Sequence, residues 1–402
     1  MIAIINGKIV PVTSEPIERG TVLIEGEKIK AVGSGITVPE GAEIVDVEGK
    51  WVLPGLIDAH THISLYGEPS IWANLDLNEM TAPNTAQLRA IDGLNPDDPA
   101  FADVLAAGIT AVYTGPGSAN IIGGMGTLIK TFGRTPEEMV VPGTEGMKMA
   151  LGENPKRVYG EDKKQYPATR MGNAAVLREA LVAAQNYLGK IDRARREDEE
   201  GKPAAYPDRD LKLEALGKVL KQKIKARIHC HRKDDILTAI RIAEEFNLDY
   251  VIEHCTEGYK IADILGAKGV NATVGPLLMG REKMEISQVT LKNPAILSKA
   301  GVKVALQMDA SSETKWLPLH AGLAVREGME EAEAFKAITI NAASITGAAD
   351  RIGSLEPGKD ADIAIFSGHP FCTFTVCERT YVDGKLAFLR EGSSAPEHYC
   401  RY

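Results

Sequence analysis

The sequence predicts an α/β protein in which a (β/α)8 TIM barrel carries a small β-sandwich built from both ends of the chain. Between residues 55 and 353, short strand-like runs alternate with amphipathic segments of helical length, a pattern typical of parallel strands with helical crossovers. That span of roughly 300 residues suits an eightfold barrel with enlarged loops. We expect residues 1–54 and 354–402 to form the two parts of the sandwich and residues 55–353 the barrel.

The first 54 residues have no helical period and predict short strands separated by turns. Asn6-Gly7 is the first turn that we expect, and further Gly-containing turns follow. After the barrel, turn signals and a β-branched run return, and Asp383-Gly384 predicts a hairpin. Residues 392–402 show no regular pattern. The expected strands here are 1–5, 8–12, 20–25, 28–32 and 43–47.

The barrel segment predicts seven strands directly, and an eighth within residues 118–135, where the glycines of 115–126 hide its position. A charge run at 191–207 is interpreted as a solvated helix end and loop. The expected strands are 56–60, 110–113, 146–150, 226–230, 250–254, 272–274 and 302–308. The expected helices are 101–107, 173–188, 211–222, 234–245, 260–265, 317–327 and 330–339.

Composition excludes several classes of protein. The net charge of -9 is spread along the chain without a Lys/Arg run, so we expect no nucleic-acid partner. No apolar stretch approaches the ~20 residues of a membrane span, and the N-terminus lacks a signal peptide. Five scattered cysteines form no disulfide framework, which indicates a reduced, cytoplasmic protein.

Metal-ligand side chains gather at the ends of four predicted strands. His60 and His62 end the first, His229 and His231 another, and His254 the next. Asp309 ends the last of the four. Five of the eight histidines therefore fall in three strands, at the carboxyl ends where a barrel builds its active site.

These residue types suit one kind of chemistry. Neutral imidazoles and a carboxylate bind Zn²⁺ or a similar divalent ion, and an open position can hold water. The ion lowers the pKa of that water toward ~7. Asp309 can then accept the proton and deliver it to a leaving group.

Several motifs carry a resemblance to a known family. They are Leu-Pro-Gly-Leu-Ile-Asp-Ala-His-Thr-His at 53–62, His229, His254, Asp309, and Gly-Ser-Leu-Glu-Pro-Gly-Lys-Asp-Ala-Asp at 353–362. Together they resemble the amidohydrolase superfamily, in particular the branch with imidazolonepropionase and the metal-dependent prolidase-like enzymes. The resemblance covers essentially the whole chain. It implies a distorted barrel plus β-sandwich, one or two divalent ions with zinc preferred, and hydrolysis of a carbon–nitrogen bond in a small molecule.

The resemblance also implies roles for single residues. His60, His62 and Asp309 share one ion, and His229 and His254 hold a second. In one-ion members, His229 joins the first ion and His254 faces the water or the substrate, so His254 is a catalytic candidate together with Asp309.

Lys148 on the fourth strand is the candidate for a carboxylated lysine that bridges two ions. Such a lysine must be neutral and buried to take up CO₂. The alternative is a charged Lys148 in contact with the substrate or with a nearby carboxylate. Glu145 and Glu153 are weaker candidates for the bridge.

Other assignments stay open at this stage. Arg232 occupies the position where deaminase members usually carry glutamate, which disfavours deamination, the alternative enzyme function. A non-catalytic scaffold is disfavoured because the five ligands are intact. His231 can contact substrate, bind metal or pack structurally, and Arg157 or Arg170 can bind a substrate carboxylate or form surface salt bridges. We also expect self-association into a homo-oligomer.

Overall fold

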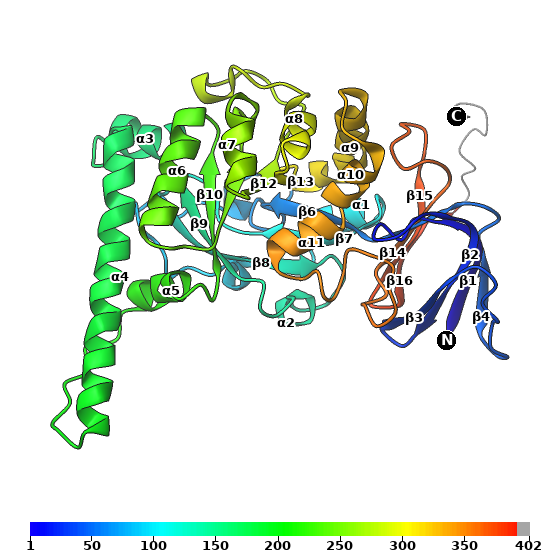
Figure 1. Cartoon of the computed structure of the whole chain (residues 1–402), viewed down its shortest axis with the longest axis horizontal. Coiled ribbons are helices and arrows are strands. Elements are labelled where there is room, and N and C mark those ends of the chain that lie inside the picture. Colours follow the sequence, from blue (N-terminus) through cyan, green and yellow to red (C-terminus); the bar gives the residue numbers. More distant parts are fainter. Residues whose placement is uncertain (392–402) are drawn as a thin grey trace.

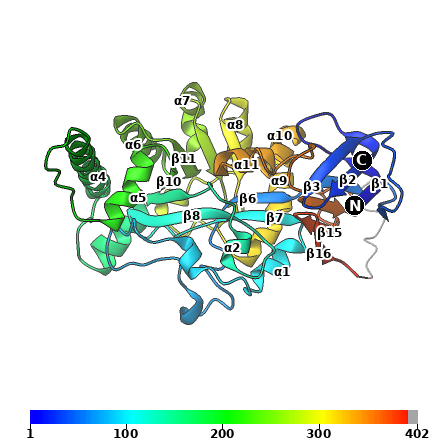
Figure 2. The ribbon, with the colours of Figure 1, turned by 90° about the horizontal axis from the view of Figure 1, so that it is seen from below.

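The computed structural model describes residues 1–391 and contains two eight-stranded sheets (Figure 1). One sheet forms the barrel, and the other combines strands from the beginning and the end of the chain. Helices α4, α6, α7 and α8 lie along one side of the barrel, and the terminal sheet lies at the opposite end of the molecule from α4 (Figure 2). The fold class that the sequence predicts is confirmed, with a second sheet beside a distorted barrel. Residues 392–402 lie outside the described part.

The barrel strands follow one another in sequence order around the sheet. The ring closes between its first and last strands through the backbone, where Asp309 N donates to His60 O (3.1 Å) and His62 N donates to Ala310 O (3.0 Å). The strands are β6 (Leu56–Thr61), β7 (Ile109–Thr114), β8 (Ile122–Lys130), β9 (Gly146–Ala150), β10 (Lys225–Cys230), β11 (Tyr250–His254), β12 (Asn271–Val274) and β13 (Lys303–Leu306).

Strand β8 departs from the predicted parallel pattern because it runs antiparallel to both β7 and β9. Residues 115–121 are all that connect β7 to β8. A parallel crossover needs a dozen or more residues, so this connector permits only a reversal of direction. The expectation of helical crossovers between all strands was therefore wrong here.

Eleven α-helices lie within residues 1–391, and α4 is the longest. Thr169 caps α4 by accepting a hydrogen bond from Gly172 N, and the helix continues through the charge run to Glu199. The helices are α1 (Ala100–Leu105), α2 (Pro136–Met139), α3 (Glu153–Lys156), α4 (Arg170–Glu199), α5 (Leu211–Leu220), α6 (Lys233–Glu245), α7 (Ala262–Ala267), α8 (Asn293–Lys299), α9 (Leu317–Arg326), α10 (Glu331–Ala337) and α11 (Ile340–Thr346). None of the described helices is long and apolar enough to cross a lipid bilayer.

The terminal sheet joins the two chain ends at β5, which pairs in parallel with β1 and antiparallel with β14. Asp383 (φ 48°) and Gly384 (φ 72°) form the predicted hairpin turn between β15 and β16. The strands are β1 (Ile2–Ile9), β2 (Ile17–Glu25), β3 (Lys28–Gly33), β4 (Glu43–Asp46), β5 (Trp51–Pro54), β14 (Ile363–Phe366), β15 (Cys377–Val382) and β16 (Lys385–Leu389).

Asn6-Gly7 is not the turn that the sequence predicts. Both residues lie inside β1, where the pairing register with β2 shifts and Asn6 adopts a φ of 58°. A Cβ on Gly7 would lie 2.6 Å from Val52 Cγ2, so the close approach of β5 requires glycine. The Asn-Gly pair thus makes an irregularity within one strand instead of separating two.

A buried charge cluster attaches the barrel to the terminal sheet. Lys130, the last residue of β8, lies 2.8 Å from Asp362 Oδ1, 2.8 Å from Asp383 Oδ1 and 3.2 Å from Asp360 Oδ2. Asp360 also pairs with Lys28 (2.6 Å) and Arg351 (2.8 Å). We call these six residues the Lys130 cluster. The reversal of β8 places Lys130 at this end of the barrel.

Candidate active site

The predicted ligand residues meet at one end of the barrel, each brought there by the end of a strand. His60 lies on β6, His229 on β10 and His254 on β11, and Asp309 follows β13. His254 (φ 66°) and Asp309 (φ 55°) hold backbone conformations that side chains other than glycine rarely adopt. Such strain is found where the surrounding structure fixes a functional geometry.

Two histidines face the carboxylate of Asp309. Its Oδ1 lies 3.0 Å from His60 Nε2 and 3.1 Å from His62 Nε2, and His254 Nε2 is 3.9 Å away. One ring atom from each of His60 and His254 and a carboxylate oxygen of Asp309 lie within 4.8 Å of one another. Asp58 connects the first and last strands of the barrel here, because it accepts hydrogen bonds from His60 N (3.0 Å) and Met308 N (3.1 Å).

The other ring nitrogens are held by partners outside this group. His254 Nδ1 lies 3.0 Å from Gly275 O and 2.9 Å from Gln307 Nε2. His60 Nδ1 donates to Glu253 Oε1 (2.9 Å), and His62 Nδ1 donates to Gly115 O (2.8 Å). In a neutral imidazole this leaves Nε2 with a lone pair. Metal-binding histidines have this arrangement, because the partner fixes the ring and directs the lone pair inward.

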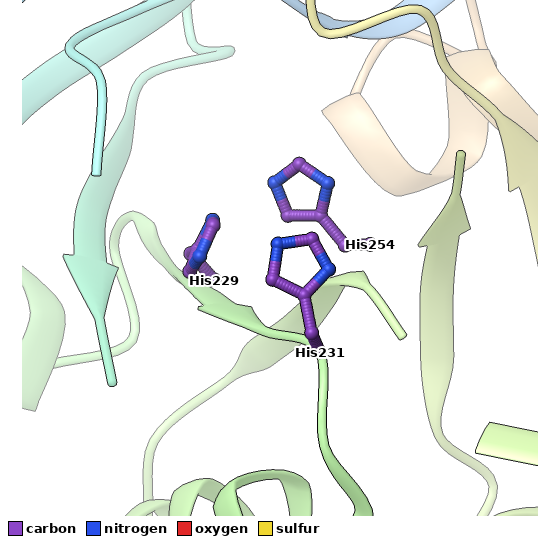
Figure 3. A group of neighbouring side chains, drawn as sticks. All are labelled: His229, His231 and His254. Atoms are coloured by element: carbon purple, nitrogen blue, oxygen red, sulfur yellow. The ribbon is translucent and has the colours of Figure 1, made fainter. Parts of the chain in front are cut away.

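His229, His231 and His254 form a second group of imidazoles beside the first (Figure 3). Their ring centroids are 4.4 to 4.7 Å apart. Neither ring nitrogen of His229 nor Nε2 of His254 has a hydrogen-bond partner, although all three atoms are buried. Buried polar atoms without partners are rare and indicate a missing ligand.

The charge state of these groups suits a cation. Burial lowers the pKa of His254 to about 4 and lowers the pKa values of His229 and His231 well below their ordinary range, which keeps the three rings neutral. Burial alone would raise the pKa of Asp309, but the neighbouring imidazoles of His254, His60 and His62 hold that pKa well below its usual range.

The donor set therefore fits a divalent metal ion. Asp309 Oδ1 lies 3.0 and 3.1 Å from His60 Nε2 and His62 Nε2, so with Nδ1 protonated these two nitrogens and the carboxylate would present three donors to one cation. Donor atoms about 2.1 Å from one tetrahedral ion are roughly 3.4 Å apart, so these contacts would need to open by a few tenths of an ångström.

Lys148 lies in the same pocket and is almost completely buried. Its Nζ donates to Glu253 Oε2 (2.5 Å) and lies 3.2 Å from His60 Nε2. Arg227 Nε donates to the other oxygen of Glu253 (2.8 Å), and its guanidinium stacks on Tyr113. In this arrangement Lys148 makes a charged contact with a carboxylate, one of the two alternatives that the sequence left open.

The two predicted substrate arginines both line one pocket, which none of the imidazoles lines. Arg170 Nε donates to Asp235 (3.1 Å), and this pocket of about 530 Å³ lies at the protein surface. Their part in binding a substrate carboxylate stays a prediction. Arg232 pairs with Asp234 (2.9 Å) at the surface, so it cannot replace the glutamate of a deaminase.

Two buried carboxylates were missed by the sequence reasoning. Glu253 precedes His254 in an apolar strand, and alternation suggests that it faces away from the site, yet it contacts His60, Lys148 and Arg227. Glu285 lies in a 3-10 turn (Met284–Ile286) after β12, where no pattern marks it. Its Oε1 is 3.7 Å from His231 Nε2 and 3.9 Å from His229 Nε2.

Comparison with known proteins places the chain in a family. A sequence model of the Amidohydrolase family matches residues 51–387. The amidohydrolase tasK of Hapsidospora irregularis is 28% identical over 415 residues, which cover 95% of this chain and 42% of that protein. The chain thus spans less than half of that relative. Imidazolonepropionase of Geobacillus kaustophilus is 28% identical, in a match that covers 87% of this chain and 84% of that protein.

Solved structures agree. An amidohydrolase from Thermotoga maritima MSB8 superposes with a TM-score of 0.92 at 46% identity, covering 97% of this chain and all (100%) of that one. A prolidase solved with n-methylphosphonate-l-proline, at 16% identity and a TM-score of 0.60, supports the fold alone. The chain belongs to the amidohydrolase family. It is accordingly a hydrolase of carbon–nitrogen bonds.

Proposed function

We propose that this protein hydrolyses an amide or lactam bond of a small molecule, including N-acyl and dipeptide bonds, with the help of bound divalent metal. The observation that carries the proposal is the convergence of His60 Nε2 and His62 Nε2 on Asp309 Oδ1, at 3.0 and 3.1 Å. The similarity to an imidazolonepropionase over most of the chain supports a carbon–nitrogen bond in a small substrate.

His60, His62 and Asp309 would hold one ion, and His229 and His254 a second. Imidazole and carboxylate donors suit zinc. Bound there, a divalent ion polarises a carbonyl oxygen and supplies an activated water at neutral pH. With one ion only, His229 would join the first three residues and His254 would face the reacting carbonyl.

Asp309 would move the proton in this reaction. Its side chain is 31% exposed, whereas those of His60 and His254 are 2% and 1% exposed, so the carboxylate lies at the mouth of the site. An anionic Asp309 takes a proton from the attacking water and delivers it to the leaving nitrogen. Its imidazole neighbours hold its pKa low, so the carboxylate is ionised at neutral pH.

Lys148 would lose its positive charge when metal binds. Its Nζ lies 3.2 Å from His60 Nε2, so an ammonium group would sit close to a doubly charged ion. Neutral Lys148 can add CO₂ and release a proton, which gives a carbamate, and this anion could bridge two ions. The position of Lys148, buried beside His60, supports the proposal that its side chain faces a bound ion.

Asp309→Asn tests the proposed function. We expect turnover to fall about 10²–10⁴-fold while metal stays bound, because the amide keeps an oxygen donor but cannot accept the proton. Metal content is measured by elemental analysis, and hydrolysis is screened over dipeptides, N-acyl amino acids and lactams. Asp263→Asn, at an exposed position on α7, is the control.

Undiminished turnover in Asp309→Asn would reject the role of Asp309. Ammonia released from aminated heterocycles, with no cleavage of amides, would establish deamination instead. We also propose that the enzyme self-associates and that it lies in the cytoplasm. Sedimentation would measure its self-association, and cell fractionation would measure its localisation.

A further inference from the structure

We infer that His231 and Glu285 complete the second ion site, so that this ion is held by four protein ligands: His229, His231, His254 and Glu285. The inference rests on the proposed metal dependence and adds two ligands to it.

The three imidazoles are arranged to bind one ion. His229 and His231 are two residues apart where β10 ends, so both side chains point to the same face. His231 Nδ1 is hydrogen-bonded to Thr256 Oγ1 (2.8 Å), and His254 Nδ1 is bonded to Gly275 O (3.0 Å). One ring nitrogen from each of the three residues lies within 4.8 Å of the others. The rings converge on a common space (Figure 3).

Glu285 supplies the fourth donor from outside the strands. Its Oε2 accepts a hydrogen bond from Glu153 N (2.8 Å), and its own backbone N donates to Glu153 Oε2 (3.2 Å). The side chain is fully buried, and Oε1 faces His231 and His229 at 3.7 and 3.9 Å. Donors that share a tetrahedral zinc ion are roughly 3.3–3.5 Å apart, so shifts of a few tenths of an ångström would suffice.

Lys283 now neutralises Glu285 from the outer side. Its Nζ lies 2.7 Å from Glu285 Oε1, and it also donates to Asn154 Oδ1 (2.9 Å). A buried carboxylate needs a counter-charge, and Lys283 provides it when the ion is absent. The Lys283 side chain is 19% exposed and can turn toward solvent, so the lysine and the ion compete for one oxygen.

The competition predicts effects of opposite sign. Glu285→Gln and His231→Asn should weaken the second ion about 10–100-fold, because each removes a donor. Lys283→Gln should instead tighten that ion, because its competitor is gone. Glu282→Gln, at an exposed neighbouring position, is the matched control and should change nothing.

The measurement is a titration of chelator-treated full-length protein with Zn²⁺ against a chromophoric chelator, which reports stoichiometry and affinity without reference to turnover. We expect two ions per chain in the wild type, one of them lost selectively in His60→Asn and the other in Glu285→Gln. Thermal unfolding of each metal-free variant checks that the chain is folded.

Two ions bound as tightly by Glu285→Gln and His231→Asn as by the wild type would overturn the inference while leaving the proposed function intact. Weaker binding in Lys283→Gln would also overturn it, since Lys283 would then support the site. A wild type that binds one ion overturns the inference alone, and one that binds none overturns the proposed function as well.

Discussion

Two lysines on neighbouring antiparallel strands are both buried, but their surroundings differ. Lys130 on β8 is surrounded by Asp360, Asp362 and Asp383, and Lys28 and Arg351 complete an equal number of positive and negative charges. Lys148 on β9 has one carboxylate, Glu253, which it shares with Arg227. Its other neighbour is the imidazole of His60.

The difference in charged neighbours distinguishes a structural lysine, Lys130, from a lysine in the candidate active site, Lys148. Burial alone would lower the pKa of Lys130, but the charges of Asp362, Asp383 and Asp360 raise it above its ordinary value, so this lysine stays a cation. The single carboxylate beside Lys148 is that of Glu253, which contacts His60 and Arg227 as well as Lys148. Burial alone would raise the pKa of Glu253, but these three neighbours hold it well below its usual range. Lys130 therefore has a complete set of counter-charges, whereas Lys148 shares its one carboxylate with two other side chains.

Of the changes considered, Lys130→Met should have the largest effect, which is a loss of stability. Removing the cation leaves buried carboxylates without their main partner, which costs about 3–5 kcal/mol of unfolding free energy. Urea unfolding measures this loss, and turnover per folded, metal-loaded molecule should stay unchanged. An unfolding free energy equal to that of the wild type would show that Lys130 does not hold the two sheets together.

Lys148→Met should have the next largest effect, which is a loss of function. We expect turnover and metal affinity to fall about 10–100-fold, with a smaller loss of stability than in Lys130→Met, because Arg227 and His60 still satisfy Glu253. In the wild type, removal of CO₂ should lower activity, bicarbonate should restore it, and native mass spectrometry should detect the added CO₂. Equal activity with and without CO₂ would exclude the carbamate.

The smallest effect is a dependence on pH. Because the folded pKa of Lys130 is raised, its stabilisation is fully present below the unfolded value of about 10.4 and is lost as the pH rises toward the folded value. The difference in unfolding free energy between the wild type and Lys130→Met should therefore narrow by roughly 1 kcal/mol between pH 9 and pH 11. A difference that stays constant would mean that Lys130 pairs too weakly to shift its pKa.

The parts of the site that lie on regular strands could be predicted from the sequence. The bounds of β9 and β11 were predicted without error, because β9 is a short run of small and apolar residues around Lys148 and β11 is an apolar run that ends at Glu253 and His254. Strand ends converge at one face of a barrel, so His60, His229, His254 and Asp309 could be grouped before any coordinates were known.

Other features depend on information that a local pattern does not contain. The direction of β8 follows from the length of its connector, which the glycines at 115–126 obscured. Glu285 comes from an irregular loop, and only the packing of Glu153 against it brings it to His231. Glu253 contacts His60 although it precedes His254 in one strand, so simple alternation failed at the strand end.

The pairing of β5 with β14 has a consequence for synthesis on the ribosome. Strand β5 ends at Pro54, and its partner β14 begins at Ile363. One edge of β5 therefore stays unpaired until the whole barrel has been translated. During that time the nascent chain exposes unpaired backbone next to apolar side chains, a condition that invites association between chains. Chaperone capture of stalled nascent chains should therefore depend on whether β14 has emerged from the exit tunnel.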